Sequence, residues 1–186
     1  METNIEIFNT ITKSIERPGV ETLIKHLKDD TDYFKAPAST RFHLNVPGGL
    51  LQHSLNVYHK FHKLLDLHDV HLEYDTIAIV SLFHDLCKIY LYKPNILKGG
   101  LKSEAKPYIH DELFPLGHGE KSLSRIRDFI SLTPREEIMI RWHMGLFDRE
   151  FMKYSDKIKD LYPEAILFHM ADWSVSIFED TYTKQK

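Results

Sequence analysis

Apolar residues recur at helical spacing along most of the chain. The first helix is predicted to open at the capping box Thr3-Asn4-Ile5-Glu6 and to stop at Pro18-Gly19. A second follows, with Val20 and Leu27 on its apolar face, and ends in the polar run at residues 29–32. These two helices, within residues 1–32, are expected to pack on the rest of the protein.

The same periodicity predicts several longer helices after a loop rich in proline and glycine at residues 34–49. One of them opens at Thr133-Pro134-Arg135-Glu136, where a capping box is combined with proline at the first helical position. We therefore expect an all-α bundle, whose later helices run from about Leu50 to Leu67, Tyr74 to about Cys87, His118 to Ile130, Thr133 onward and Pro163 onward.

Residues 89–117 lack a helical period. Ile89-Tyr90-Leu91-Tyr92 and Tyr108-Ile109 are rich in β-forming residues, which predicts a small hairpin or flap. Five lysines lie between Lys88 and Lys106, opposed only by Glu104. We expect this flap to form one wall of a pocket that attracts phosphate groups, since long irregular segments often act as lids or binding loops.

Composition indicates one soluble domain spanning residues 1–186, with a frayed tail at 181–186. The 24 basic and 27 acidic residues give a net charge of −3, so the chain has no general attraction to nucleic acid or to an anionic membrane. The single cysteine excludes an intrachain disulfide, and neither a signal peptide nor a membrane span is visible. A cytoplasmic protein is predicted.

Several ionisable residues fall on the apolar faces of predicted helices, where each needs a partner. His53 lies between Leu50 and Val57, and His84-Asp85 directly follows an apolar run at residues 77–83. Similar positions are taken by His118, His143 and Asp172. Imidazole and carboxylate together suit a transition metal better than Ca²⁺, and the lack of clustered cysteines argues against structural zinc. A hydrogen-bonded core pair is the alternative for His84-Asp85 alone, and Cys87 is interpreted as a small buried hydrophobic residue.

The order His53, His84-Asp85, Asp172 resembles that of the HD-domain metal-dependent phosphohydrolases. Three segments carry the resemblance, which spans about residues 33–180. The segment at 48–54 is similar to the family's first histidine helix, and the one at 84–88 to its doublet followed by lysine, with Cys87 where glycine is frequent. The segment at 117–122 is similar to an additional histidine segment of many members.

This resemblance implies an HD-type helical bundle that hydrolyses phosphomonoesters or phosphodiesters, often of nucleotides. It implies one metal held by His53, His84, Asp85 and Asp172. A second would use His118 and His143, with Asp85 as the bridge; otherwise these two histidines bind substrate or a metal-bound water. The cofactors would be one or two divalent ions from the set Mn, Fe, Ni, Co, Zn or Mg.

The predicted function is metal-dependent hydrolysis of a phosphorylated small molecule or nucleotide, in which a metal lowers the pKa of bound water. Asp85 and Lys88 are the catalytic candidates, although Lys88 could also be a solvated lysine at a helix end. Further candidates for substrate binding are Arg41, His43 and Lys121; for the first two a plain loop role is equally open.

Two other functions stay open. A 3′-5′ nuclease acting on RNA or DNA is suggested by Pro37-Ala38-Ser39, which resembles a segment of exoribonucleases in the same superfamily. A non-enzymatic regulatory or binding module that keeps the fold is the third. The chain has no glycine-rich phosphate loop and no Gly-x-Ser-x-Gly sequence, which argues against kinase and serine hydrolase chemistry.

Overall fold

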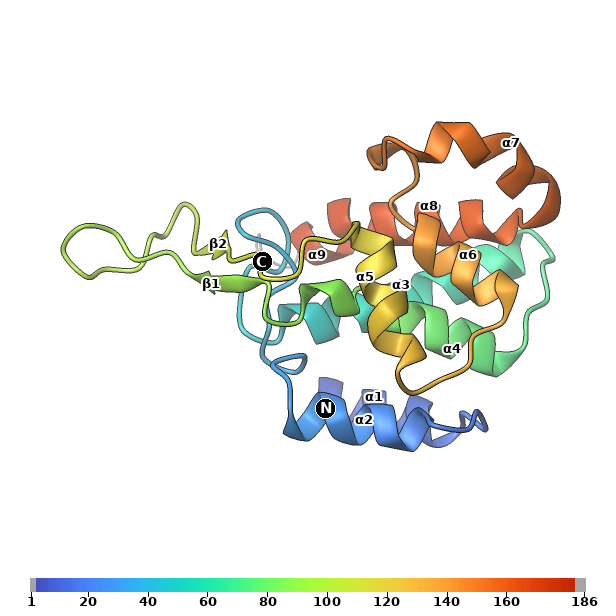
Figure 1. Ribbon diagram of the computed structural model, residues 1–186, viewed down its shortest axis with the longest axis horizontal. Coiled ribbons are helices and arrows are strands. Elements are labelled where there is room, and N and C mark those ends of the chain that lie inside the picture. The colour runs from blue at the N-terminus through green and yellow to red at the C-terminus, as the bar shows by residue number, and fades with distance from the viewer. Residues whose placement is uncertain (1–2, 183–186) are drawn as a thin grey trace.

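The apolar periodicity becomes a set of packed helices in the computed structural model, which describes residues 3–182 (Figure 1). This confirms the all-α fold class in its coarse form. Two short 3₁₀ turns, Leu86–Lys88 and Gly145–Phe147, follow α4 and α6. The α-helices are α1 Asn4–Lys13, α2 Val20–Asp29, α3 Gly49–Leu67, α4 Tyr74–Phe83, α5 His118–Arg127, α6 Pro134–Trp142, α7 Phe151–Leu161, α8 Glu164–Ile177 and α9 Glu179–Tyr182.

Helix α4 lies at the centre of the bundle. Every residue from Thr76 to Phe83 is buried, as expected for a helix that is apolar on all sides. It packs against α3 and α6, and α3 in turn packs along α8. The end of α4 is therefore surrounded by other helices, and any polar side chain placed there is removed from water.

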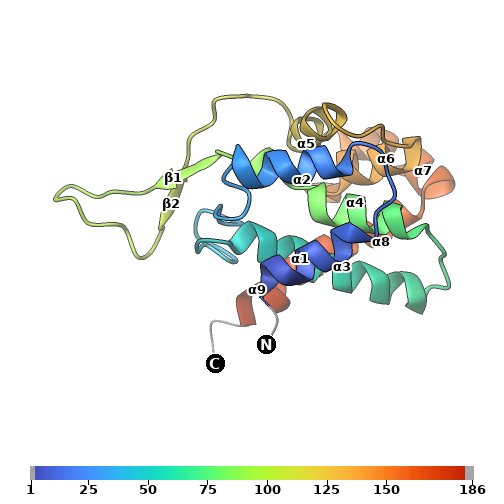
Figure 2. The same ribbon diagram turned by 90° about the horizontal axis from the view of Figure 1, so that it is seen from below.

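The N-terminal helices pack on the bundle, with α1 lying along α3 (Figure 2). Gly19 joins α1 to α2 with φ of +89°, and a Cβ there would lie 1.9 Å from the Phe129 carbonyl oxygen. The preceding Arg17 donates hydrogen bonds of 3.0 and 2.9 Å to the two carboxylate oxygens of Glu136 in α6. A backbone contact and an ion pair thus join the start of the chain to the segment after α5 and to α6.

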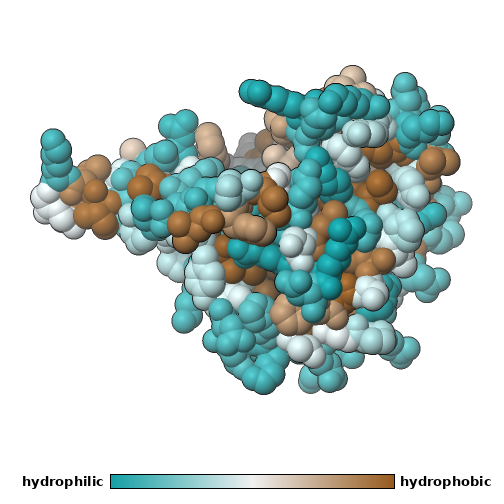
Figure 3. Space-filling model, in the orientation of Figure 1, coloured by the Kyte–Doolittle hydropathy of each residue, from teal (hydrophilic) through white to brown (hydrophobic). Residues whose placement is uncertain are grey.

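A two-stranded hairpin projects from the helical body (Figures 1 and 2). Strand β1, Tyr92–Pro94, pairs antiparallel with β2, Tyr108–His110. The hairpin was expected, but the first strand begins later than predicted. Tyr90 has a φ of +55°, so residues 89–91 form a turn after the 3₁₀ segment instead of a strand. Figure 3 shows hydrophobic and hydrophilic side chains side by side on this projection, where Ile96, Leu97 and Leu101 are exposed.

Some predicted boundaries are wrong. Helix α4 ends at Phe83 and not near Cys87, and α5 ends at Arg127 and not at Ile130. Helix α7 was not predicted. The frayed tail falls partly outside the described residues, which end at Tyr182, while Thr181 and Tyr182 belong to α9. Within residues 3–182, no helix has both the length and the apolar character needed to cross a bilayer.

Candidate metal centre

The end of α4 brings two adjacent residues to the same point. Neighbouring side chains of a continuous helix do not face each other. Here His84 caps the helix, and Asp85 leaves it with φ of −105° and ψ of 20° before the 3₁₀ turn begins. As a result His84 Nε2 lies 3.5 Å from Asp85 Oδ2, and both residues are buried.

Two further helices complete a cluster around this pair. His53 comes from α3 and Asp172 from α8, and His53 Nε2 lies 3.0 Å from Asp172 Oδ1 and 3.5 Å from Asp85 Oδ2. His84 Nε2 lies 3.8 Å from Asp172 Oδ1. Ligand atoms of His53, His84 and Asp172 all lie within 4.8 Å of one another. The four residues named from the sequence therefore meet at one place.

The orientation of the histidines suits metal binding. His84 Nδ1 lies 2.9 Å from the Ser81 carbonyl oxygen, and His143 Nδ1 lies 2.7 Å from that of Ile140. A carbonyl only accepts hydrogen bonds, so each Nδ1 carries the proton and each Nε2 presents a lone pair. The Nε2 atoms of His84 and His143 are buried, and neither has a hydrogen-bond partner among the described residues, whereas the buried Nε2 of His53 lies 3.0 Å from Asp172 Oδ1. Metal-binding histidines show this pattern.

Asp180 in α9 is a residue of the site that the sequence interpretation missed. Its Oδ2 lies 2.7 Å from His53 Nδ1, and its Oδ1 accepts a 2.7 Å hydrogen bond from Asn56 Nδ2. The side chain is fully buried. The available signal was its spacing of eight residues from Asp172, which keeps both on one helical face if the helix continues. The polar residues around Asp180 concealed it.

Asp85 also faces a second group of side chains through its other oxygen. His118 Nε2 lies 2.8 Å from Asp85 Oδ1, and His143 Nε2 lies 3.6 Å from the same atom. Lys88 Nζ lies 2.6 Å from Asp85 Oδ2. All three residues named from the sequence thus surround one carboxylate, which is placed between the two groups of ligands.

The electrostatics of the cluster favour a bound cation. Burial alone would raise the pKa of Asp85, but the Lys88 ammonium group 2.6 Å away holds it well below its usual range. Burial also opposes a charge on His53, yet the Asp172 and Asp180 carboxylates outweigh this and raise its pKa to about 9. For His84 burial dominates and lowers the pKa to about 3, so this imidazole is neutral.

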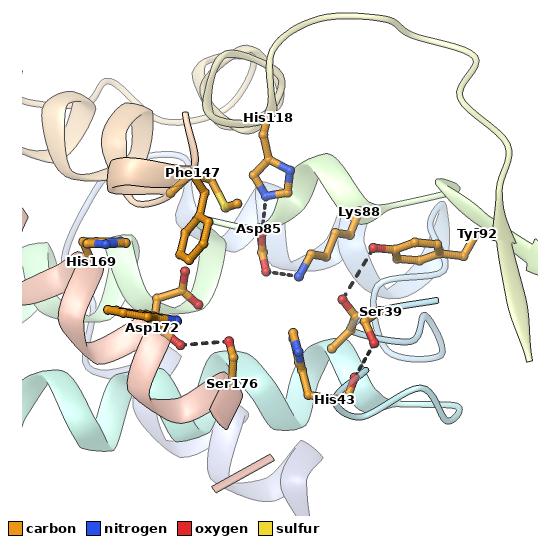
Figure 4. Close-up of a pocket in the computed structure, with 13 residues that line it drawn as sticks. Ser39, His43, Asp85, Lys88, Tyr92, His118, Phe147, His169, Asp172 and Ser176 are labelled. Atoms are coloured by element: carbon orange, nitrogen blue, oxygen red, sulfur yellow. Dashed lines mark hydrogen bonds and ion pairs between the residues drawn. The ribbon is translucent and has the colours of Figure 1, made fainter. Parts of the chain in front are cut away.

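A cavity of about 210 Å³ opens onto the cluster (Figure 4). Asp85, Lys88 and His118 line one part of it, and Phe147, His169 and Trp173 form an aromatic wall beside Asp172. On the remaining side lie Ser39, His43 and Tyr92. Burial lowers the pKa of His43 to about 4 and raises that of Tyr92 to about 12, so both are neutral at pH 7.

Two proposed substrate contacts lie elsewhere. Lys121 is buried and its ammonium group pairs with Glu112, so it is not available to the cavity. Arg41 is exposed, and its guanidinium lies 4.9 Å from the centre of the Phe42 ring. Neither is among the described residues that line the cavity. In the loop at residues 39–43, Ser39 and His43 line it and Arg41 does not.

The predicted role of the flap is also corrected. Of the described residues between 89 and 117, Tyr92 alone lines the cavity, and the rest of the hairpin extends outward. Lys93 pairs with Asp111 across the hairpin at 2.7 Å, and Lys102 lies 3.9 Å from the centre of the Tyr108 ring. These two lysines are therefore engaged within the hairpin, and among the described residues the flap contributes Tyr92 alone to the cavity wall.

The buried histidine and aspartate groups can hold a metal ion. Three buried imidazole nitrogens, two of them without a hydrogen-bond partner among the described residues, converge with two carboxylates, and hydrogen bonds to the Nδ1 atoms fix the rings. The donor set is mixed nitrogen and oxygen, as transition metals prefer. Comparisons with known proteins add no relative: no family model, no curated protein and no solved structure matches this chain.

Proposed function

We propose that the protein is a metal-dependent phosphohydrolase of the HD-domain type. The observation that carries this is the convergence of buried imidazole nitrogens on Asp85 at the floor of a cavity that also holds Lys88; those of His84 and His143 lack a hydrogen-bond partner within residues 3–182. A stable core does not leave such nitrogens unpaired without a ligand.

The residues divide into two ligand groups that share Asp85. His53, His84, Asp85 and Asp172 would hold one ion, and His118 and His143 would join Asp85 around a second. Bound divalent ions would supply Lewis acidity, by lowering the pKa of water and by stabilising charge on the phosphoryl oxygens. Asp180 holds the His53 ring in place through Nδ1.

Lys88 is suited to contact the phosphate. Burial lowers its pKa, but Asp85 more than compensates, so the ammonium group stays charged inside the cavity. Its attraction to an anion is strong there, because little water screens it. We assign Lys88 to the stabilisation of negative charge on the transferred group.

The aromatic wall favours a nucleotide over a phosphoester without a planar group. His169 and Trp173 are stacked with an angle of 11° between their rings. Phe147 lies against Trp173 with its ring centre 5.6 Å away, and both side chains are about half exposed or more. Exposed aromatic faces next to a phosphate-binding position suit the stacking of a nucleobase.

The test is a hydrolysis screen with chelator-treated protein, to which Mn²⁺, Fe²⁺, Co²⁺, Ni²⁺, Zn²⁺ or Mg²⁺ is returned singly. Mononucleotides, cyclic nucleotides and phosphoesters without a base form the substrate panel. We expect metal-dependent release of phosphate or nucleoside monophosphate, abolished by Asp85→Ala with helical content preserved by circular dichroism. Metal-replete protein that hydrolyses nothing, or an Asp85→Ala variant with full activity, would contradict the proposal.

A second candidate is a nuclease that acts on single-stranded RNA or DNA. The exposed Lys98, Lys102 and Lys106 on the hairpin favour it, since a polymer held at the cavity could extend along this projection. Replacing these three lysines with alanine should leave mononucleotide hydrolysis unchanged in both cases. A selective loss on oligonucleotides would favour the nuclease.

A further inference from the structure

The one cysteine of the chain lies inside the second group of ligands. Cys87 Sγ is 3.2 Å from His118 Nε2 and 3.7 Å from Asp85 Oδ1, and those two atoms are 2.8 Å apart. Resting on the proposed function, we propose that Cys87 binds the second metal ion as a thiolate, together with Asp85, His118 and His143. The site would then select a thiophilic ion such as Zn²⁺ or Co²⁺.

The three atoms have the spacing that such an ion requires. Tetrahedral zinc has bonds of about 2.0 Å to nitrogen or oxygen and about 2.3 Å to sulfur, which places neighbouring ligand atoms roughly 3.2–3.6 Å apart. The three separations between donor atoms, 2.8, 3.2 and 3.7 Å, each lie within about half an ångström of that range. Small movements of the side chains would therefore place an ion between them.

The backbone fixes Cys87 relative to His118. Cys87 lies in the 3₁₀ turn, and its N–H donates a 3.0 Å hydrogen bond to Ser122 Oγ. Ser122 is fully buried in α5, four residues after His118. This hydrogen bond holds the turn that carries Asp85 and Cys87 against the helix that carries His118. The relative positions of the Asp85, Cys87 and His118 donor atoms are therefore set by the packing of the core.

His143 provides an independent indication of a ligand at this place. It is fully buried, its Nδ1 is taken by the Ile140 carbonyl, and its Nε2 is 3.6 Å from Asp85 Oδ1 without a hydrogen-bond partner in the described part of the chain. The His118 and His143 ring centres are 5.1 Å apart. In this structure His143 groups with His84 and Asp85, next to the group of Asp85, Cys87 and His118. A shift of its Nε2 toward a bound ion would add the fourth donor and give a set of two nitrogens, one oxygen and one sulfur.

Thiolate in this set changes which ion is preferred. Sulfur ligands favour zinc and its neighbours over Mg²⁺ or Mn²⁺, which prefer oxygen. On binding, the S–H bond of Cys87 breaks, its proton is released to solvent, and a sulfur–metal bond forms. The other ion, held by His53, His84, Asp85 and Asp172 alone, has no sulfur donor. The two positions should therefore differ in selectivity.

The test uses Co²⁺ as a spectroscopic probe in the full chain. Purified metal-free protein is titrated with Co²⁺, and the near-ultraviolet thiolate-to-cobalt charge-transfer band is followed together with bound cobalt per chain. We expect the charge-transfer band to appear in the wild type when two equivalents of Co²⁺ are bound per chain. It should be absent in Cys87→Ser and Cys87→Ala, which should keep one cobalt and native helical content.

Zinc affinity provides a second measurement. Cys87→Ser should weaken binding of the second zinc ion by more than about tenfold, because changing even a residue that only hydrogen-bonds to a metal ligand causes a loss of about that size. The affinity for Mn²⁺ should change little. An X-ray absorption spectrum of zinc-loaded wild type should contain a sulfur neighbour at about 2.3 Å. As a matched control, Ser124→Ala on α5 should keep the band and both zinc ions.

Three results would overturn the inference. Cobalt that binds and supports hydrolysis without a charge-transfer band would leave the proposed function standing and remove Cys87 from the ligands. Protein that binds no cobalt or zinc at all would remove both proposals. A band of equal intensity in Cys87→Ser would show that the absorption does not arise from this thiolate, and would also refute the assignment.

Discussion

At the scale of single residues, the hydrogen bond between Asp180 and His53 determines how one candidate metal ligand is oriented. Asp180 accepts from His53 Nδ1 and from Asn56 Nδ2, and so fixes the ring with Nε2 toward Asp85 and Asp172. Because the carboxylate is buried, its charge acts on the imidazole with little screening. It should make His53 a stronger donor to a metal.

Asp180→Asn should therefore lower metal affinity by about 10- to 100-fold, the range seen when partners of metal-binding histidines are changed. The amide keeps the shape and removes the charge. The measurement is competition with a coloured chelator, with circular dichroism to monitor folding. Asp160→Asn, at an exposed position on α7, is the control and should bind as the wild type does. Equal affinities in the two variants would show that Asp180 has only a packing role.

The aromatic wall gives a second prediction at this scale. Trp173→Ala should raise KM for a nucleotide by roughly 5- to 100-fold, since a stacked base contributes about 1–3 kcal/mol. The kcat/KM for a phosphoester without a base should stay the same. Trp142→Phe, a buried position on α6 outside the cavity, is the control. If both substrates respond equally to Trp173→Ala, the wall does not recognise a base.

The sequence predicted the central residues of the cluster because each is an ionisable group on an apolar stripe. His53, His84, Asp85 and Asp172 were identifiable for that reason. Asp180 was not, since it follows the apolar stripe in a polar segment. The location of Arg41 and Lys121 outside the cavity was not visible in the sequence, because side-chain direction in a loop and ion pairing with Glu112 depend on tertiary contacts. Periodicity carries no information on either.

At the scale of elements, the approach of α5 to α6 positions His118. A Cβ on Gly119 would lie 2.3 Å from the Arg141 carbonyl oxygen, so the two helix backbones are nearly in contact. No side chain fits between them without movement of one helix. The absence of a side chain at this residue therefore helps to hold His118 within reach of Asp85.

Gly119→Ala should accordingly lower the free energy of unfolding by about 1–3 kcal/mol, in the range of overpacked cores. It should also weaken the second metal equivalent, because α5 must shift and carries His118 with it. Thermal denaturation and metal titration measure the two effects. Ser124→Ala on the same helix should alter neither. Unchanged stability in Gly119→Ala would mean that the contact relaxes without loss.

Elements were predicted well where periodicity was strong. Helices α3 and α8 were identified because long apolar stripes mark them. Helix α7 was missed because Phe151 and Ile158 are its only buried residues among those described. The first strand was misplaced because the left-handed conformation of Tyr90 is unusual for this residue type. Tertiary contacts, which a single sequence does not reveal, decide such cases.

At the scale of the whole molecule, Glu136 connects three parts of the fold. It accepts hydrogen bonds from Arg17, from Thr76 of α4 and from the Thr133 backbone. Burial alone would raise its pKa, but Arg17 and the other donors outweigh this and lower it. A carboxylate with a folded pKa below its unfolded value stabilises the protein above the unfolded value, and this stability is lost as pH falls toward the folded one.

We therefore expect the free energy of unfolding to decrease as pH falls below about 5, and Glu136→Gln to reduce that dependence. At pH 7 the same variant should be less stable by about 1–3 kcal/mol, because Arg17 and two other donors lose a charged acceptor. Urea denaturation between pH 3.5 and 7 provides the comparison. Glu137→Gln, a more exposed neighbour that pairs with Arg127, should keep the pH dependence of the wild type. Parallel curves for Glu136→Gln and wild type would contradict the assignment.

The abrupt end of α4 has a consequence for how the chain can vary in length. His84 and Asp85 converge because the helix stops between them, so one residue added at this junction would rotate one ligand away from the other. The hairpin between Asn95 and Lys106 has no such constraint, since it extends away from the helical body (Figure 1). Insertions and deletions should accumulate at the hairpin tip and be absent from residues 80–88. The chain thus combines a segment of fixed length with one whose length is free to change.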